Sequence, residues 1–189
     1  MGAAPVLYIN GFPGTGKLTV ARAIIGLLGE DQALLIDNHG LIDPVEARCG
    51  RSHPRYLIER RKERERTFRL YVYDKGTRFK TLVFTGNEYL FLERPDAARK
   101  AGRMFIPVNL FCDIEENVQR ICSDDRAHSG TTKLLDPKIL VDLRSRFEIF
   151  RFDIPEELCL NITSKEPEEV ARAIVKWLTS WRASRIRSY

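Results

Sequence analysis

Short apolar runs alternate along the chain with longer segments in which apolar and polar positions follow a helical spacing. Strands that alternate with helices are typical of βαβ units, and unbroken apolar runs are typical of parallel strands buried on both faces. The pattern therefore predicts an α/β fold, with a five-stranded parallel sheet between two layers of helices. The runs predict strands near residues 5–10, 33–37, 80–84, 105–111 and 158–162. The helical patterns predict helices near 16–29, 54–74, 87–101, 114–123, 137–150 and 166–182.

The predicted elements follow one another without an internal repeat or a low-complexity linker. The chain has 189 residues, which is enough for one compact domain with a core. We therefore expect a single domain over residues 1–182. Residues 183–189 are basic and unpatterned, and we expect a tail or the start of a linker there.

The most informative segment is the glycine-rich loop after the first predicted strand, which reads Gly11-Phe12-Pro13-Gly14-Thr15-Gly16-Lys17. Glycines let backbone N–H groups turn toward an anion, and the start of the following helix adds further N–H groups. A lysine at this position reaches the β- and γ-phosphates of a nucleotide. The loop is therefore expected to bind the phosphates of ATP or a close relative. The expected phosphate-binding residues are Gly11, Gly14, Thr15, Gly16, Lys17, Leu18 and Thr19.

The residue after Lys17 departs from the general phosphate-loop pattern, which has Ser or Thr there to hold Mg²⁺. This chain has Leu18 and then Thr19. The order Gly-x-Pro-Gly-x-Gly-Lys-x-Thr resembles the loop of adenylate kinases and related nucleoside monophosphate kinases. The resemblance implies a three-layer α/β/α P-loop fold with a short lid. It also implies that Thr19 lies near the α-phosphate and that Mg²⁺ is held mainly by phosphates, water and carboxylates, so we assign no metal ligand in the loop.

Asp37 ends the second predicted strand, 20 residues after Lys17. Ligands of open parallel sheets bind beyond the carboxyl ends of the strands, so Asp37 is expected to face the phosphate loop. A carboxylate there accepts or positions the proton of an attacking hydroxyl, whereas the alternative is that Asp37 only caps the next helix. Its position resembles that in kinases of the shikimate kinase and chloramphenicol phosphotransferase type, which implies a role at the acceptor hydroxyl. His39 is a candidate substrate contact.

The region between the second and third strands carries the acceptor site in the kinases that the chain resembles. Its charged run over 54–66 predicts a helix with a solvated face. Tyr56 and Asn87 are candidate substrate-binding residues on either side of the third strand. Thr85 stands before Gly86, where monophosphate kinases usually have Asp. The missing carboxylate leaves the metal arrangement open and argues against an adenylate kinase proper.

Two arginines follow the fourth predicted strand, one on a short helix and one in a loop. This order resembles the lid of the same kinases, expected over about 123–136. Phosphoryl transfer needs cations that neutralise the transferring phosphate, and Arg provides planar bidentate donors. By resemblance Arg120 lies near the adenine or the phosphates, and Arg126 near the transferring phosphate. Lys133 is a further candidate cation in the lid.

Two later segments add candidate contacts. The amphipathic helix over 137–150 carries Arg144 and Arg146, and related kinases have a further phosphate-contacting Arg on this helix. Arg144 is therefore a candidate substrate contact. Thr163 or Ser164 can cap the final helix, and the resemblance implies that this turn borders the adenine, so Thr163 is a candidate nucleotide contact.

Charge and cysteine content add little to this picture. The net charge of +5 and the pI of about 9.1 fit a nucleic-acid binder and a polyphosphate pocket equally. No apolar run approaches the roughly 20 residues of a membrane span, so we expect no membrane partner. The cysteines lack disulfide-framework or zinc-site spacing, which predicts reduced thiols and a cytoplasmic location. They are Cys49, Cys112, Cys122 and Cys159.

The leading hypothesis is an ATP- and Mg²⁺-dependent kinase that phosphorylates a hydroxyl of a small molecule. Its expected catalytic residues are Lys17, Asp37, Arg120 and Arg126. A nucleoside-like acceptor is the first choice, because His39, Tyr56 and Tyr89 can stack on or bond to a base. An antibiotic, a sugar or another polyol comes next. Two alternatives stay open: a nucleotide-binding module without transfer, and a kinase acting on nucleic-acid ends. The oligomeric state is left open.

Overall fold

The structure, a computed structural model, describes residues 2–50, 52–86, 94–123 and 133–186. Its centre is a five-stranded sheet in which every neighbouring pair of strands is parallel, in the order β2-β3-β1-β4-β5. This confirms the predicted α/β fold. The strands are β1 (Val6–Asn10), β2 (Ala33–Ile36), β3 (Thr81–Thr85), β4 (Phe105–Phe111) and β5 (Leu158–Asn161).

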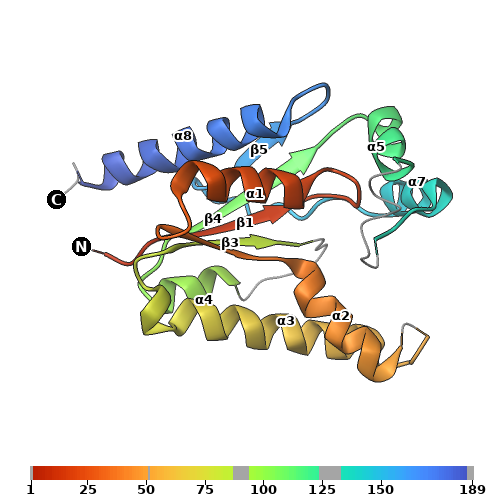
Figure 1. The fold of residues 1–189 in the computed structure, drawn as a ribbon, viewed down its shortest axis with the longest axis horizontal. Coiled ribbons are helices and arrows are strands. Elements are labelled where there is room, and N and C mark those ends of the chain that lie inside the picture. Colours follow the sequence, from red (N-terminus) through yellow and green to blue (C-terminus); the bar gives the residue numbers. More distant parts are fainter. Residues whose placement is uncertain (1, 51, 87–93, 124–132, 187–189) are drawn as a thin grey trace.

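Helices cover both faces of this sheet, so the molecule has three layers (Figure 1). α1 (Lys17–Leu28) and α8 (Pro167–Ile186) lie together on one face. α3 (Tyr56–Tyr73) and α4 (Arg94–Lys100) cover the other face. α2 (Asn38–Cys49) packs along α3, and α5 (Ile114–Ile121) and α7 (Pro137–Arg146) contact each other near the end of the molecule where β4 ends.

Alternate residues of the central strand face the two layers, as the period of a strand requires. Leu7 and Ile9 of β1 pack into the core shared with α1 and α8. Val6 and Tyr8 pack into the core shared with α3 and α4. All five residues of β1 are buried, which explains why the sequence shows an unbroken apolar run there. Because the strands are parallel, their carboxyl ends all lie at the same edge of the sheet.

The helices differ from the prediction in four places. α8 continues to Ile186, past its predicted end at residue 182 and into the segment expected to be a tail or linker. α2 was not predicted, because Gly40 and Pro44 interrupt the segment, and a proline inside a helix removes a backbone hydrogen bond. α7 ends at Arg146 instead of continuing to residue 150, since Phe147 is extended. α4 begins at Arg94, and the first part of the helix predicted over 87–101 lies outside the described residues.

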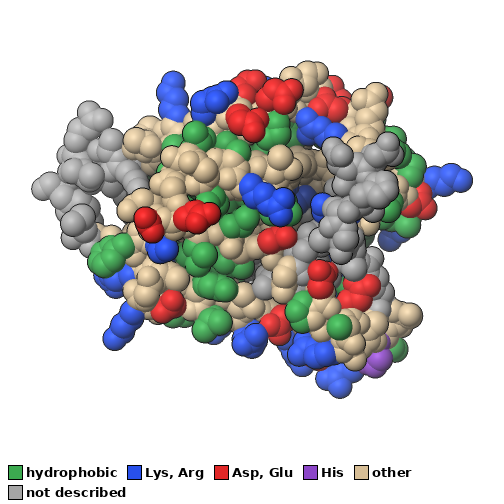
Figure 2. All heavy atoms as spheres, viewed as in Figure 1, with side chains coloured by type: hydrophobic (Ala, Val, Ile, Leu, Met, Phe, Trp, Pro, Cys, Tyr) green, Lys and Arg blue, Asp and Glu red, His purple; other side chains and the backbone are tan. Residues whose placement is uncertain are grey.

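The surface carries both signs of charge. Figure 2 shows Lys and Arg side chains and Asp and Glu side chains scattered over the visible face, with uncharged surface between them. Several of them pair along α3, for example Arg66 with Glu63 at 2.6 Å and Arg61 with Glu65 at 3.0 Å. In the described part of the chain, no helix has the length and apolar character that a membrane span requires.

Candidate functional site

The phosphate loop connects β1 to α1 and is packed from behind by α5. Gly14 has a φ of 86°, and a Cβ at this position would lie 2.6 Å from Asn117 Nδ2 and 2.7 Å from Ile121 Cγ1. Gly16, which precedes α1, has a φ of 75°. Both conformations favour glycine, and the contact at Gly14 leaves no room for any side chain. The sequence needs glycine there to bring backbone close to a neighbouring helix.

The Lys17 side chain extends back along this loop and contacts its backbone. Its Nζ donates hydrogen bonds to Gly11 O at 2.9 Å and to Phe12 O at 2.7 Å. The buried Thr15 donates from Oγ1 to Phe12 O at 2.9 Å and shapes the same turn. The ammonium charge is therefore held beside the backbone N–H groups at the start of α1, where it adds to the positive potential of the helix terminus.

A buried asparagine braces the loop from α5. Asn117 is 0% exposed and donates from Nδ2 to Pro13 O at 2.8 Å. Its Oδ1 accepts from Arg144 Nη1 at 2.8 Å, and Arg144 Nη2 donates to Cys112 O at 3.0 Å. The Arg144 guanidinium also lies 5.3 Å from the centre of the Phe12 ring. Arg144, predicted as a substrate contact, is thus placed where it holds the phosphate loop through α5.

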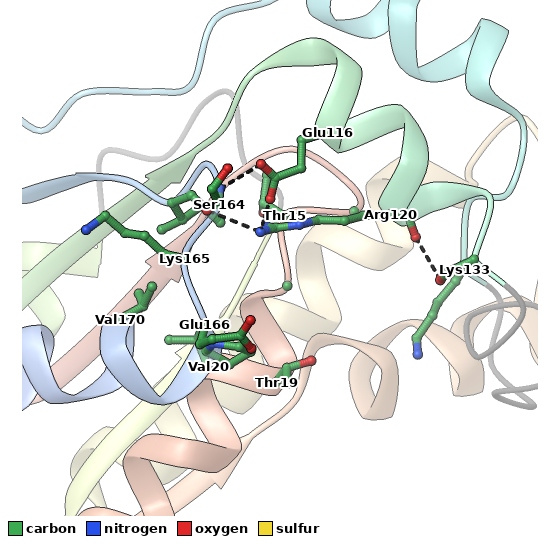
Figure 3. Close-up of a pocket in the computed structure, with 15 residues that line it drawn as sticks. Thr15, Thr19, Val20, Glu116, Arg120, Lys133, Ser164, Lys165, Glu166 and Val170 are labelled. Carbon is green, nitrogen blue, oxygen red and sulfur yellow. Dashed lines mark hydrogen bonds and ion pairs between the residues drawn. The ribbon is translucent and has the colours of Figure 1, made fainter.

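A cavity of about 540 Å³ opens beside the loop (Figure 3). Gly14, Thr15, Gly16 and Thr19 form one wall. The structure brings Arg120 and Lys133 from the lid side to the same cavity. The described residues that line it do not include Gly11, Lys17, Leu18 or Thr163. Thr163 instead accepts from Asp113 N at 2.9 Å and ties β5 to the end of β4.

Arg120 is fixed inside this cavity by partners on two elements. It forms an ion pair with Glu116 on its own helix, and its Nη2 donates to Ile162 O at 3.1 Å. Glu116 Oε2 accepts from Ser164 N at 2.7 Å, so one carboxylate holds both the arginine and the turn before α8. Figure 3 shows Glu116, Arg120 and Ser164 close together, with dashed lines that mark their interactions. Glu116 could not be identified from the sequence, because an acidic residue in the first turn of a helix is ordinary.

A second group of predicted site residues lies around Asp37. This residue follows β2 and precedes α2, and its half-buried side chain accepts from Thr85 Oγ1 at 3.1 Å. The Asp37 side chain makes no capping hydrogen bond to α2, so the geometry does not support the alternative that Asp37 only caps this helix. Asn38 N donates to Thr85 Oγ1 at 3.1 Å instead. The Thr85 hydroxyl on the neighbouring strand therefore accepts from the first backbone N–H of α2, as the side chain of a capping residue would.

A groove of about 790 Å³ runs from Asp37 between α2 and α3. Arg48, Glu63 and Arg66 provide its charges, and the buried Thr67 lies among them. The pKa of Glu63 is lowered from its ordinary value, first by the hydrogen bond from Arg66 and also by the charge of Arg48, while burial works against the shift. The wall of this groove is therefore polar, with both signs of charge.

Several predicted substrate contacts do not line this groove in the described structure. Tyr56 is 6% exposed, and the guanidinium of Arg60 lies 5.4 Å from the centre of its ring. His39 lies in α2, but its side chain is not described. Asn87, Tyr89 and Arg126 lie outside the described residues. Among the described residues, no three His, Cys, Asp or Glu side chains gather as a metal site.

Comparisons with known proteins identify the fold. No protein family model and no curated protein sequence matches the chain. A gluconokinase from Sinorhizobium meliloti 1021 is 15% identical with a TM-score of 0.68, and 98% of each chain is covered. A sugar kinase from Janibacter sp. HTCC2649 is 15% identical with a TM-score of 0.66, covering 93% of this chain and 95% of the other.

An APS kinase from Mycobacterium tuberculosis, solved in complex with AMPPNP and APS, is 20% identical with a TM-score of 0.58. The match covers 95% of this chain and 99% of that one. The chain therefore has a P-loop kinase-like fold along nearly its whole length. At these identities the likeness establishes the fold, and the function has to be argued from the site.

Proposed function

We propose that the protein is an ATP-dependent kinase that transfers the γ-phosphate to a hydroxyl group of a small molecule. One observation carries this proposal. The phosphate loop and Arg120 line one cavity, and Asp37 stands at the carboxyl end of β2, two strands away in the same sheet. These are the parts that phosphoryl transfer needs: a phosphate cradle, a cation for developing charge and a carboxylate for the acceptor.

Each part has a role in a balanced reaction. The loop N–H groups and Lys17 hold the β- and γ-phosphates, and Arg120 neutralises charge on the transferring group. The acceptor oxygen forms a bond to the γ-phosphorus while the bond to the β,γ-bridging oxygen breaks, and ADP leaves. The hydroxyl proton passes to Asp37. Arg126 is proposed as a second cation of the lid.

Mg²⁺ is proposed as the metal partner of ATP. It supplies neutralising charge on the phosphates and is usually held by phosphates, water and one or two carboxylates. Asp37 is the carboxylate at the strand ends that fits this role, through a metal-bound water. Thr19 lines the nucleotide cavity and is proposed to lie near the α-phosphate.

For the acceptor we propose a polyhydroxyl compound, such as a sugar or sugar acid, ahead of a nucleoside. Tyr56, which was expected to stack on a base, lies beneath Arg60, away from the groove. The groove beside Asp37 offers paired charges and a hydroxyl, which suit several hydroxyl groups. The similar structures include a gluconokinase and a sugar kinase, which supports the same choice.

An acceptor screen tests this proposal. ADP release from ATP and Mg²⁺ is measured with sugars, sugar acids, polyols, nucleosides and aminoglycoside-type antibiotics, using the Lys17→Ala variant as the inactive control. Turnover that depends on a hydroxyl compound and on Lys17 is the expected result. Tight ATP binding without turnover across the panel would contradict it and favour a binding module. Turnover only with oligonucleotide ends, weakened steeply by salt, would favour a nucleic-acid kinase.

A further inference from the structure

We propose that Thr85, which replaces the carboxylate of the kinases that the chain resembles, is a positioning residue that fixes Asp37 for proton transfer. The inference rests on the proposed kinase function and deepens it. Thr85 ends β3 and is 5% exposed, next to Asp37 on the neighbouring strand end. Its hydroxyl makes two hydrogen bonds, one to Asp37 Oδ1 and one from Asn38 N, both at 3.1 Å.

The direction of these bonds follows from the number of protons. The Asn38 backbone N–H has a proton to give, so Thr85 Oγ1 accepts there. Its own single proton is then free to go to Asp37 Oδ1, which must accept it. Thr85 therefore delivers a hydrogen-bond donor to a carboxylate oxygen. Among the described residues no other group hydrogen-bonds Asp37, which leaves Oδ2 for the acceptor hydroxyl.

The network continues onto the helix that forms the acceptor groove. Asn38 is 6% exposed, and its Oδ1 accepts from Arg64 Nε at 3.1 Å. Arg64 is 8% exposed and lies on α3, one residue from Glu63 of the groove. The chain of contacts from Arg64 through Asn38 and Thr85 thus connects α3 to Asp37. An acceptor held against α3 and the carboxylate that takes its proton share one rigid support.

An Asp at position 85 would repel Asp37 and would not donate a hydrogen bond to it. Two carboxylates within hydrogen-bond distance repel each other, and neither can donate a proton to the other when both are ionised. The Asn38 N–H would still find an acceptor, but Asp37 would lose its donor. The geometry therefore explains why a threonine, and not an acidic residue, is compatible with Asp37 in this chain.

The test compares three substitutions at position 85 with the best acceptor from the screen. Thr85→Val removes the hydroxyl at nearly constant volume and is expected to lower kcat by about 10- to 100-fold, the scale of a misplaced catalytic group. The KM for ATP is expected to stay within about twofold, since Thr85 does not line the nucleotide cavity. Thr85→Ser restores the donor and is expected to recover kcat to within about threefold of wild type. Thr85→Asp is expected to remain impaired.

A double variant separates positioning from a general structural effect. If Thr85 acts through Asp37, then Asp37→Asn with Thr85→Val loses no more activity than Asp37→Asn alone. Multiplied losses, or a wild-type kcat in Thr85→Val, would overturn the proposal. Should Thr85→Val fail to fold, Thr85→Ala removes the same hydroxyl without adding a methyl group, and the same expectations apply to it.

A failure of the Thr85 positioning proposal can be distinguished from a failure of the proposed kinase function. If wild type phosphorylates nothing in the panel, the kinase proposal fails. The network is then tested by urea unfolding of wild type, Thr85→Val, Asp37→Ala and the corresponding double variant, because the amide oxygen of Asp37→Asn still accepts from Thr85. Non-additive changes in the free energy of unfolding support the Thr85–Asp37 contact. Additive changes mean that Thr85 does not hold Asp37, and the positioning proposal fails independently.

Discussion

The glycines of the phosphate loop show how far a single Cβ can matter. Gly14 combines a φ of 86° with a neighbour that leaves no room for a side chain. Gly29 has nearly the same φ, 87°, but a Cβ there would meet no atom within 4 Å. The two positions therefore separate backbone strain from steric collision.

Substituting each glycine by alanine tests this difference. Gly29→Ala is expected to cost about 1–3 kcal/mol of stability, because residues with a Cβ rarely adopt its φ of 87° with a ψ of 144°, and to leave ATP binding unchanged. Gly14→Ala is expected to lose ATP binding as well, because the loop must move away from Asn117. Thermal unfolding and calorimetric titration with ATP measure the two effects. Equal ATP affinity in both variants would contradict the packing argument.

The cysteines differ in accessibility. Burial raises the pKa of the Cys112 thiol, and burial together with the charge of Glu157 raises that of Cys159. Cys122 is exposed. A thiol with a raised pKa forms its reactive thiolate only at higher pH, so Cys112 and Cys159 are expected to react slowly with iodoacetamide near pH 7 and faster as the pH rises. Cys122 is expected to be labelled first. Mass spectrometry of digested protein gives the order, and early labelling of Cys112 would contradict the burial.

Residue-scale prediction from sequence works where one local pattern carries the chemistry. The phosphate loop and Lys17 were found because glycines, lysine and helix start are consecutive. Thr85 was noticed as a departure, but its bond to Asp37 joins residues 48 positions apart. Asn117 and Glu116 gave no signal at all, since their partners, Pro13 and Ser164, are set by how α5 packs. Such contacts form between elements of the folded protein, so the spacing of apolar and polar residues along the sequence does not predict them.

At the scale of elements, α7 supports the phosphate loop through α5. Arg144 donates hydrogen bonds to Asn117 and Cys112, whereas Arg146, on the same helix, pairs with Asp142 and is largely exposed. Arg144→Met is expected to weaken ATP binding by roughly 10-fold, the scale of one or two lost hydrogen bonds to a charged group. Arg146→Met is the matched control and is expected to bind ATP as wild type does. Equal affinities in the two variants would contradict the bracing role.

The elements themselves were largely predictable. All five strands and the long helices follow from apolar runs and helical spacing, because burial on a parallel sheet imposes both. α2 was missed because Gly40 and Pro44 weaken its local pattern, and its packing against α3 compensates. The groove beside Asp37 lies between these two helices, so missing α2 also meant missing the groove.

At the scale of the molecule, the strand order determines which residues are neighbours at the carboxyl ends of the strands. β3 lies between β2 and β1, so Thr85 stands between Asp37 and the phosphate loop. Elements far apart in sequence thereby share one edge of the sheet, as the fold of P-loop kinases requires. The sequence predicted a parallel sheet in which Asp37 faces the phosphate loop, but it did not predict the strand order that places Thr85 between them. The acceptor's identity depends on side chains in the groove.

Nucleotide binding should stabilise the whole fold. ATP with Mg²⁺ at 100 times its Kd is expected to add about 2.7 kcal/mol to the free energy of unfolding, because it binds only the folded state. The Lys17→Ala variant is expected to show little or no such gain at the same concentration. Thermal unfolding with and without nucleotide measures both. Equal protection of the variant and wild type would contradict the role of Lys17.

The proposed function requires that Asp37 acts on an acceptor hydroxyl while the loop holds ATP. The most direct test is a single-turnover transfer from γ-labelled ATP to the acceptor, with Asp37→Asn beside wild type. The account predicts that wild type forms a labelled phosphate ester, and that Asp37→Asn binds ATP within a few-fold of wild type but transfers roughly 10²-fold more slowly. Transfer by Asp37→Asn at the wild-type rate, or release of inorganic phosphate alone by wild type, would contradict it.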